Sequence, residues 1–138
     1  DRIALFCRRT IQTNNTGDII YSLPTLYSIV THLEESADNM HAILKIAIAN
    51  PVKLNKQTIE LFHVCIRLQE IIFSIFGKVM KGENIFLQEN LFKEHKNAYE
   101  RIRKNLSYFR GDHINSYICN RLLSIARLSR HISEELFY

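Results

Sequence analysis

Hydrophobic residues recur at intervals of three and four along most of the chain, and no stretch shows the strict alternation of apolar and polar residues that a half-buried strand requires. The spacing predicts one short helix and four long ones, over residues 1–11, 22–50, 56–81, 84–109 and 113–137. Polar residues, Pro or Gly interrupt the pattern between them, at residues 13–18, 50–51, 82 and 110–112. The pattern therefore predicts an all-α protein.

Each long helix carries an apolar stripe that would face its neighbours. In the helix over residues 22–50 the stripe is Leu26, Ile29, Leu33, Ala37, Met40, Leu44 and Ala47. The next helix has a wider surface, which predicts burial on more than one side: Ile59, Phe62, Ile66, Phe73, Phe76 and Met80, with Val64, Leu68, Ile71 and Ile75 beside them. The helix over residues 84–109 aligns Ile85, Phe92, His95, Tyr99, Ile102, Leu106 and Phe109. Long helices with short breaks predict an antiparallel up-and-down bundle.

Part of the chain repeats. Residues 26–38 have a partial copy at residues 122–134, so that Leu26 corresponds to Leu122 at an offset of 96 residues. An offset of this length fits a group of helices rather than a short solenoid unit. The repeat predicts that the helices over residues 22–50 and 113–137 occupy equivalent positions in successive units.

The first copy contains a recognisable motif. Residues 33–38 read Leu-Glu-Glu-Ser-Ala-Asp and continue into Asn-Met-His-Ala-Ile. This segment resembles the Leu-Glu-Arg-Ile-(Gly/Ala)-Asp signature of the PhoU-like phosphate-uptake regulators, and residues 1–9 resemble the second helix of the archaeal members. The resemblance implies tandem three-helix repeats within one domain over residues 1–138. Residues 1–50 would be the tail of a first repeat, and residues 51–138 a complete second repeat.

The chain opens on Asp1 and runs directly into an amphipathic segment without a capping residue before it. We therefore expect a fragment of a longer protein. Archaeal members of the resembled family often carry an AbrB-like DNA-binding domain at the N-terminus, which would precede Asp1.

The acidic motif supplies the candidate metal site. In the resembled family the acids of the Glu-x-x-x-Asp motif bind metal clusters, and Glu34 and Asp38 match those positions. Carboxylates four residues apart share one helix face and can hold a divalent or iron-type ion together, and His41 could add a nitrogen ligand. Glu35 stands where the family usually has Arg. A solvated polar stripe is the alternative interpretation of these residues.

The second copy departs from the motif. Arg130 replaces the Glu and Glu134 replaces the Asp. These two residues are spaced to form an opposite-charge pair along one helix, and a guanidinium would repel a cation. We therefore expect no second metal site there.

Six histidines are present, and His95 is the one placed within an apolar stripe. We expect it to be a core histidine that hydrogen-bonds a neighbour, with metal ligation as the alternative. The sequence spacing of His32, His63, His113 and His131 indicates no shared site.

Charge and cysteines restrict the class of protein. The net charge of +4 is small, and no groove-entering motif accompanies the basic clusters. The clusters Arg8-Arg9 and Arg101, Arg103 and Lys104 are therefore interpreted as solvated helix faces, with a phosphate-contacting role as the alternative. Cys7, Cys65 and Cys119 are odd in number and lie among apolar residues, which predicts buried reduced thiols and a cytoplasmic protein. Charged residues interrupt the apolar segment 59–80, so no membrane insertion is expected.

The resemblance implies a non-enzymatic regulatory protein of phosphate uptake or phosphate signalling that acts through protein contacts. Its implied partners are a second copy in a homodimer and a phosphate ABC-transporter ATPase or a sensor kinase, with DNA reached only through the missing N-terminal domain. One alternative is a generic helical dimerisation or interaction module. Another is a metal-dependent helical enzyme, but a di-iron bundle needs Glu-x-x-His pairs on two helices. Asp38 and His41 give the nearest approach to such a pair.

Overall fold

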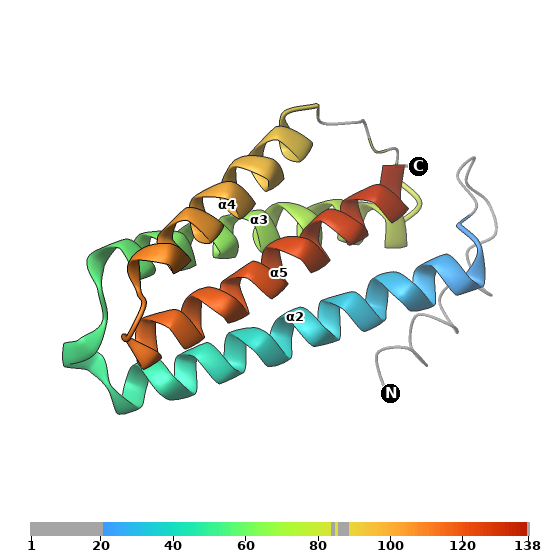
Figure 1. Cartoon of the computed structure of the whole chain (residues 1–138). Helices are drawn as coiled ribbons and strands as arrows, with labels where there is room; N and C mark the ends of the chain where they lie inside the picture. The colour runs from blue at the N-terminus through green and yellow to red at the C-terminus, as the bar shows by residue number, and fades with distance from the viewer. Residues whose placement is uncertain (1–20, 84, 86–88, 138) are drawn as a thin grey trace.

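The chain forms an up-and-down antiparallel helical bundle in a computed structural model that describes residues 21–83, 85 and 89–137 (Figure 1). The helices are α2 (Leu23–Ala49), α3 (Lys56–Met80), α4 (Glu89–Tyr108) and α5 (His113–Phe137), with a short 3-10 turn, η1 (Pro51–Lys53), after α2. Within the described residues there is no strand, and the predicted all-α fold is confirmed. The predicted helix over residues 1–11 and the turn over residues 13–18 lie outside the described residues.

Local sequence signals set the helix boundaries. The Ser22 hydroxyl accepts a hydrogen bond from the Thr25 backbone N–H at 3.3 Å, and Pro24 occupies the first turn of α2, where no backbone donor is needed. The Asn55 side chain caps α3 by accepting from the Gln57 N–H at 2.8 Å. Gly82 has a φ of 69° just after α3, a left-handed conformation that favours glycine.

One boundary was predicted wrongly. The pattern placed the start of the fourth helix near residue 84, whereas α4 begins at Glu89, and Ile85 lies outside any helix although it is packed against the core. Gly82 ends α3 in a left-handed conformation, and Ile85 contributes to the core without belonging to the helical register.

Helix α5 holds the bundle together, because it packs against α2, α3 and α4. Figure 1 shows α5 running antiparallel to α2 along most of their length. Two clusters of buried side chains fill the interior. The first is Ile43, Leu61, Cys65, Ile102, Phe109, Ile118, Cys119, Leu122, Ile125 and Ala126. The second is Ile29, Leu33, Leu68, Ile72, Ile75, Leu91, Ala98, Ile132 and Leu136.

The predicted stripes of α2 and α3 were partly misplaced. In α2, Ala37 and Leu44 are exposed, whereas Ser36 and Ile43 are buried. In α3, Ile59 and Phe73 are 42% and 52% exposed, and the buried side instead consists of Thr58, Leu61, Cys65, Leu68, Gln69, Ile72 and Ile75. Both helices carry more apolar residues than one face can bury. Only those apolar residues of α2 and α3 that face α5 or another neighbouring helix are therefore buried in the core.

The two copies of the repeat bury corresponding positions. Leu26 and Leu122 are both buried, as are Ile29 and Ile125, and Val30 and Ala126. The repeat predicts this agreement, but the shared apolar spacing would also produce it in any two amphipathic helices. Equivalence of the two units, and their assignment as three-helix repeats, stays a prediction.

A buried asparagine fixes the start of α5. The Asn115 amide donates to the Lys53 carbonyl at 2.8 Å and to Asp112 Oδ2 at 2.7 Å. Its carbonyl oxygen accepts from the Asn55 N–H at 2.9 Å. These bonds attach the beginning of α5 to the connection between α2 and α3.

Candidate functional site

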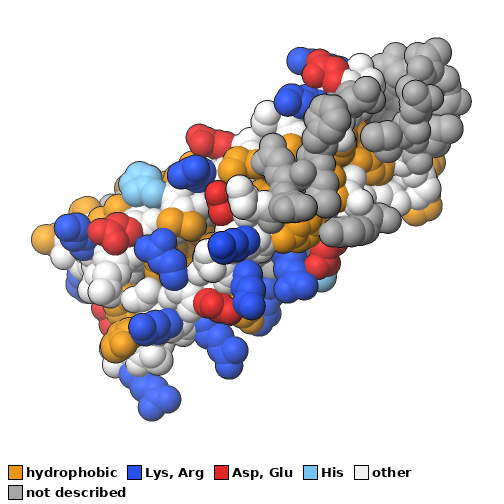
Figure 2. Space-filling view, turned by 90° about the horizontal axis from the view of Figure 1, so that it is seen from above, with side chains coloured by type: hydrophobic (Ala, Val, Ile, Leu, Met, Phe, Trp, Pro, Cys, Tyr) orange, Lys and Arg blue, Asp and Glu red, His pale blue; other side chains and the backbone are white. Residues whose placement is uncertain are grey.

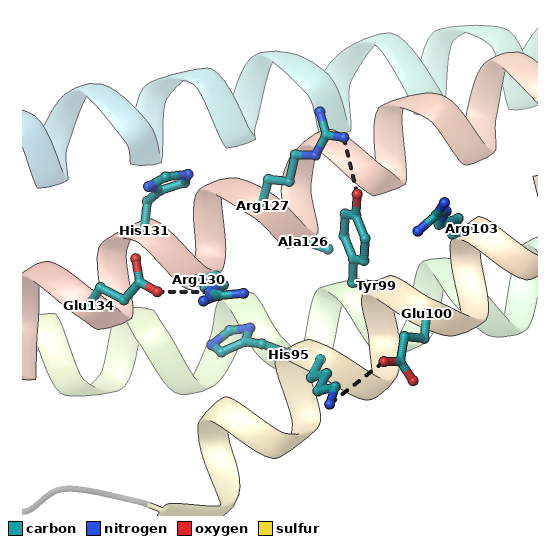
Figure 3. Close-up of a pocket in the computed structure, with 10 residues that line it drawn as sticks. His95, Tyr99, Glu100, Arg103, Ala126, Arg127, Arg130, His131 and Glu134 are labelled. Atoms are coloured by element: carbon teal, nitrogen blue, oxygen red, sulfur yellow. Dashed lines mark hydrogen bonds and ion pairs between the residues drawn. The ribbon is translucent and has the colours of Figure 1, made fainter.

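A groove of about 540 Å³ lies between α4 and α5 (Figure 3). Its lining comes from both helices, and every lining residue except Ala126 carries a polar or charged group, although carbon atoms supply more of the exposed lining than nitrogen and oxygen atoms. The lining residues are His95, Lys96, Tyr99, Glu100, Arg103, Ala126, Arg127, Arg130, His131 and Glu134. On each helix these residues recur at intervals of three and four, which places them on one face. Figure 2, seen from the α4 side of the bundle, shows Lys and Arg side chains gathered on that side with acidic side chains between them.

The groove has an excess of positive charge. Four cationic side chains and two carboxylates line it. Lys96 Nζ lies 4.0 Å from Glu100 Oε1, and Arg130 Nε lies 2.8 Å from Glu134 Oε1. The side chains in both pairs are at least 40% exposed, so each pair stabilises the fold by well under about 1 kcal/mol and can rearrange around a ligand.

The remaining two arginines lie near Tyr99. Arg127 Nη2 donates a hydrogen bond to Tyr99 Oη at 3.1 Å, and its guanidinium carbon lies 5.6 Å from the centre of the ring. This hydrogen bond, with the charges of Arg127 and Arg103, lowers the pKa of the Tyr99 phenol below its usual value. Among the described residues neither Arg103 nor Arg127 forms an ion pair with a carboxylate. Their charge is therefore available to an anion.

His95 forms a buried part of the groove wall. It is 2% exposed, which confirms the prediction that it belongs to the core. Its Nε2 lies 2.9 Å from Ser133 Oγ, and that hydroxyl donates its own proton to the Ser129 carbonyl at 2.9 Å. With the Ser133 proton given to the Ser129 carbonyl, we assign the Ser133 oxygen as the acceptor from His95, which places the proton on Nε2 and leaves a lone pair on Nδ1. Nδ1 is buried and has no hydrogen-bond partner among the described residues.

The same surroundings keep His95 neutral. Burial, helped by the positive charge of Arg130 and opposed by Glu134, lowers its pKa to about 4. Behind this ring the polar chain continues into the core, because Gln69 Nε2 donates to Ser129 Oγ. A neutral acceptor is therefore held at the wall of a groove that otherwise presents cationic donors.

The predicted metal residues lie elsewhere. Glu34 on α2 is partly buried, whereas Asp38 and His41 are exposed, and none of the three lines the groove. Within the described residues no group of three or more His, Cys, Asp or Glu side chains is close enough to hold a metal ion. The continuous helix keeps Glu34 and Asp38 on one face, so binding by these acids stays a prediction.

The pair predicted in the second copy is present, since Arg130 and Glu134 form the ion pair described above. Sequence reasoning did not recognise that these residues line a groove. It also grouped Arg103 with Arg101 and Lys104 as a solvated face, whereas Arg103 alone of the three lines the groove. The sequence does show polar residues at helical intervals on each of the two helices. It does not show that these two polar faces lie next to each other.

Two histidines without any sequence relationship meet between α2 and α5. The ring centres of His32 and His131 are 5.8 Å apart, and His32 Nδ1 lies 3.5 Å from Glu135 Oε2. Ser28 Oγ donates to the other oxygen of Glu135 at 2.5 Å. Helical spacing could not predict whether these histidines lie close together, because they come from different helices.

Cys65 and Cys119 are free and fully buried, which confirms the prediction for these two thiols. Burial raises the pKa of Cys65 to about 12 and also raises that of Cys119. Cys7 lies outside the described residues.

Among the helices that the structure describes, none has the length and apolar character needed to cross a bilayer. No family model, curated protein or solved structure matches the chain. The PhoU-like resemblance therefore depends on the residues quoted for it above.

Proposed function

We propose that the chain is a non-enzymatic regulatory domain of phosphate uptake or phosphate signalling, which works in the cytoplasm through protein–protein contacts. Its proposed partners are a second copy of itself and either the ATPase of a phosphate transporter or a sensor kinase. Contact with DNA would require an additional domain. Family membership of the PhoU-like kind is part of this proposal.

The observation that supports it best is the arrangement of the acidic motif on α2. Leu33 is 9% exposed and Ser36 is 2% exposed, so one side of the motif is fixed in the core. Glu35 and Asp38 are exposed on the same helix. A rigid helix that presents carboxylates to solvent is suited to recognising a basic surface on a partner, where charge complementarity sets specificity and the rate of association.

The experiment replaces the chromosomal gene in the native host. Deleting it should raise phosphate uptake and a phosphate-starvation reporter in phosphate-rich medium. The double variant Glu34→Gln with Asp38→Asn should reproduce this effect at normal protein levels, because it neutralises two of the motif's three carboxylates and retains the shape of both side chains. A matched control, Glu60→Gln with Glu70→Gln, changes two exposed acids of α3 and should behave as wild type. Unchanged uptake and reporter activity in the deletion strain would refute the proposal.

Exposed apolar side chains favour a second candidate, a helical dimerisation module. At the end of α2 and in η1, Ile48 is 78% exposed and Val52 is 97% exposed, and Leu44 is 47% exposed one turn earlier. The double variant Ile48→Glu with Val52→Glu should convert a dimer to a monomer in light scattering without loss of helical content. A wild-type monomer at high concentration would count against this candidate and against the proposed homodimer.

A further inference from the structure

We propose that the groove between α4 and α5 binds a phosphate group through its arginines and reads a hydroxyl on that ligand through His95. Hydrogen phosphate is the simplest such ligand, and a phosphate ester of a sugar has the same chemistry. The inference goes beyond the proposed function, because a regulator that works through protein contacts does not need to bind phosphate itself.

The cationic side chains account for recognition of the anion. Arg103 on α4 and Arg127 on α5 both line the groove, with Tyr99 between them in Figure 3, and neither forms an ion pair within the described residues. Guanidinium groups present several N–H donors in a plane, which suits the oxygens of phosphate. Lys96 and Arg130 are held only in exposed pairs with Glu100 and Glu134, so they can also turn toward a doubly charged ligand.

His95 adds selectivity for a hydroxyl. The chain from His95 Nε2 to Ser133 Oγ and on to the Ser129 carbonyl leaves Nδ1 as a hydrogen-bond acceptor with no partner. Figure 3 shows the ring beside the Arg130 side chain, which is 65% exposed and held only by its pair with Glu134. A ligand that donates a hydrogen bond to Nδ1 would satisfy this buried atom, whereas one that presents only acceptor oxygens would place lone pair against lone pair.

This arrangement predicts discrimination between two similar anions. At neutral pH hydrogen phosphate carries one P–O–H group, and sulfate carries no proton. Sites built to hydrogen-bond a substrate hydroxyl reject analogues that lack it, because the buried group is left unpaired. We therefore expect sulfate to bind at least about tenfold more weakly than phosphate.

The groove is large enough for either source of phosphate, so an experiment has to distinguish them. At about 540 Å³ it falls in the range of pockets that hold small organic molecules. Titration calorimetry with inorganic phosphate, ribose 5-phosphate and sodium sulfate separates the sources at constant ionic strength. Tighter binding of ribose 5-phosphate would indicate an organic ligand, and equal or tighter binding of inorganic phosphate would indicate the free ion. Either result supports the site if sulfate is rejected.

Variants place the binding in the groove. Arg103→Gln and Arg127→Gln should each weaken phosphate binding by about tenfold, because each removes a charged donor. Arg101→Gln is the matched control, since Arg101 is exposed on the same helix but does not line the groove. Equal loss in the control, equal affinity for sulfate and phosphate, or no binding of either phosphate ligand at about 1 mM would overturn the proposal.

The tautomer of His95 gives an independent readout. Nitrogen chemical shifts of labelled histidine should show the proton on Nε2 and a free lone pair on Nδ1 in the wild-type protein. Ser133→Ala removes the acceptor of the Nε2 proton, so the proton can move to Nδ1. Nδ1 would then donate a hydrogen bond to an anion oxygen, and sulfate binding should improve relative to phosphate binding. A proton on Nδ1 in the wild type would overturn the proposal even if the variant fails to fold. These measurements use purified protein. A negative result would therefore refute the phosphate site without refuting the regulatory function in cells, and a negative result in cells would not refute the phosphate site.

Discussion

His95 on α4 and Ser133 on α5 are joined by a hydrogen bond of 2.9 Å between Nε2 and Oγ. The bond lies in the core, where His95 is 2% exposed and Ser133 is fully buried. It links two helices that also form the walls of the groove, and the tautomer assigned to His95 follows from it together with the contact of Ser133 to the Ser129 carbonyl. The same bond therefore contributes to the stability of the bundle and to the chemistry of the groove.

Stability should fall as the solution becomes more acidic, with His95 as a main cause. In the unfolded chain this residue takes up a proton below its ordinary pKa of 6.5, whereas in the folded protein its pKa is lowered to about 4. Between these values the unfolded state binds more protons, so the free energy of unfolding decreases as the pH falls. His95 should account for a loss of about 3 kcal/mol between pH 7 and pH 4, measured by urea unfolding.

His95→Gln provides the comparison, because its amide can still donate to Ser133 but does not titrate. The other five histidines are the same in both proteins. The variant should therefore show a flatter dependence on pH than the wild type. Identical slopes would mean that other groups cause the acid sensitivity.

The two buried thiols should be inert in the native protein. Burial raises the pKa of Cys65 to about 12, and the thiolate that reacts with disulfide reagents is then almost absent at pH 8. In a Cys7→Ser background, Cys65 and Cys119 should resist Ellman's reagent in buffer and react within minutes in denaturing urea. Rapid labelling of the folded protein would show that the core opens more readily than this packing implies.

A matched pair of isoleucine truncations should separate core from surface. Ile125 is 0% exposed in the first core cluster, and Ile48 is 78% exposed on α2. Ile125→Ala should lower the free energy of unfolding by about 2–5 kcal/mol, because it removes buried methyl groups and leaves a cavity. Ile48→Ala should change the free energy by about 0.5 kcal/mol or less. Chemical denaturation of both variants measures the difference. A similar loss in the free energy of unfolding for both would contradict the burial of Ile125 in the core.

If a divalent or iron-type metal ion binds, we expect Glu34 and Asp38 to hold it, with His41 as an additional ligand for a transition metal. Glu34→Gln with Asp38→Asn should then abolish binding in calorimetry or elemental analysis at unchanged helical content. Glu134→Gln should leave binding intact, because Arg130 occupies the corresponding position of the second copy and pairs with Glu134. Metal retained in the double variant would exclude the motif as the site.

Helix identity and most boundaries were determined by the sequence alone, since they depend on local chemistry. The Ser22 and Asn55 caps and the glycines at residues 82 and 111 act within a few residues of the chain. The same local information predicted His95 as a core residue, because it lies in an apolar stripe. The pairing of Arg130 with Glu134 was predictable too, since one turn of helix separates them.

The tertiary structure determined which faces meet, and no local rule contains that information. Ile59 and Phe73 read as core residues but remain exposed, because α3 has more apolar surface than its neighbours cover. The groove arises because α4 and α5 pack with Arg103 and Arg127 on facing sides, although these residues are far apart in the chain. The contact of His32 with His131 has the same origin. Helical periodicity specifies the direction of each side chain around its own axis, and only packing places two axes side by side.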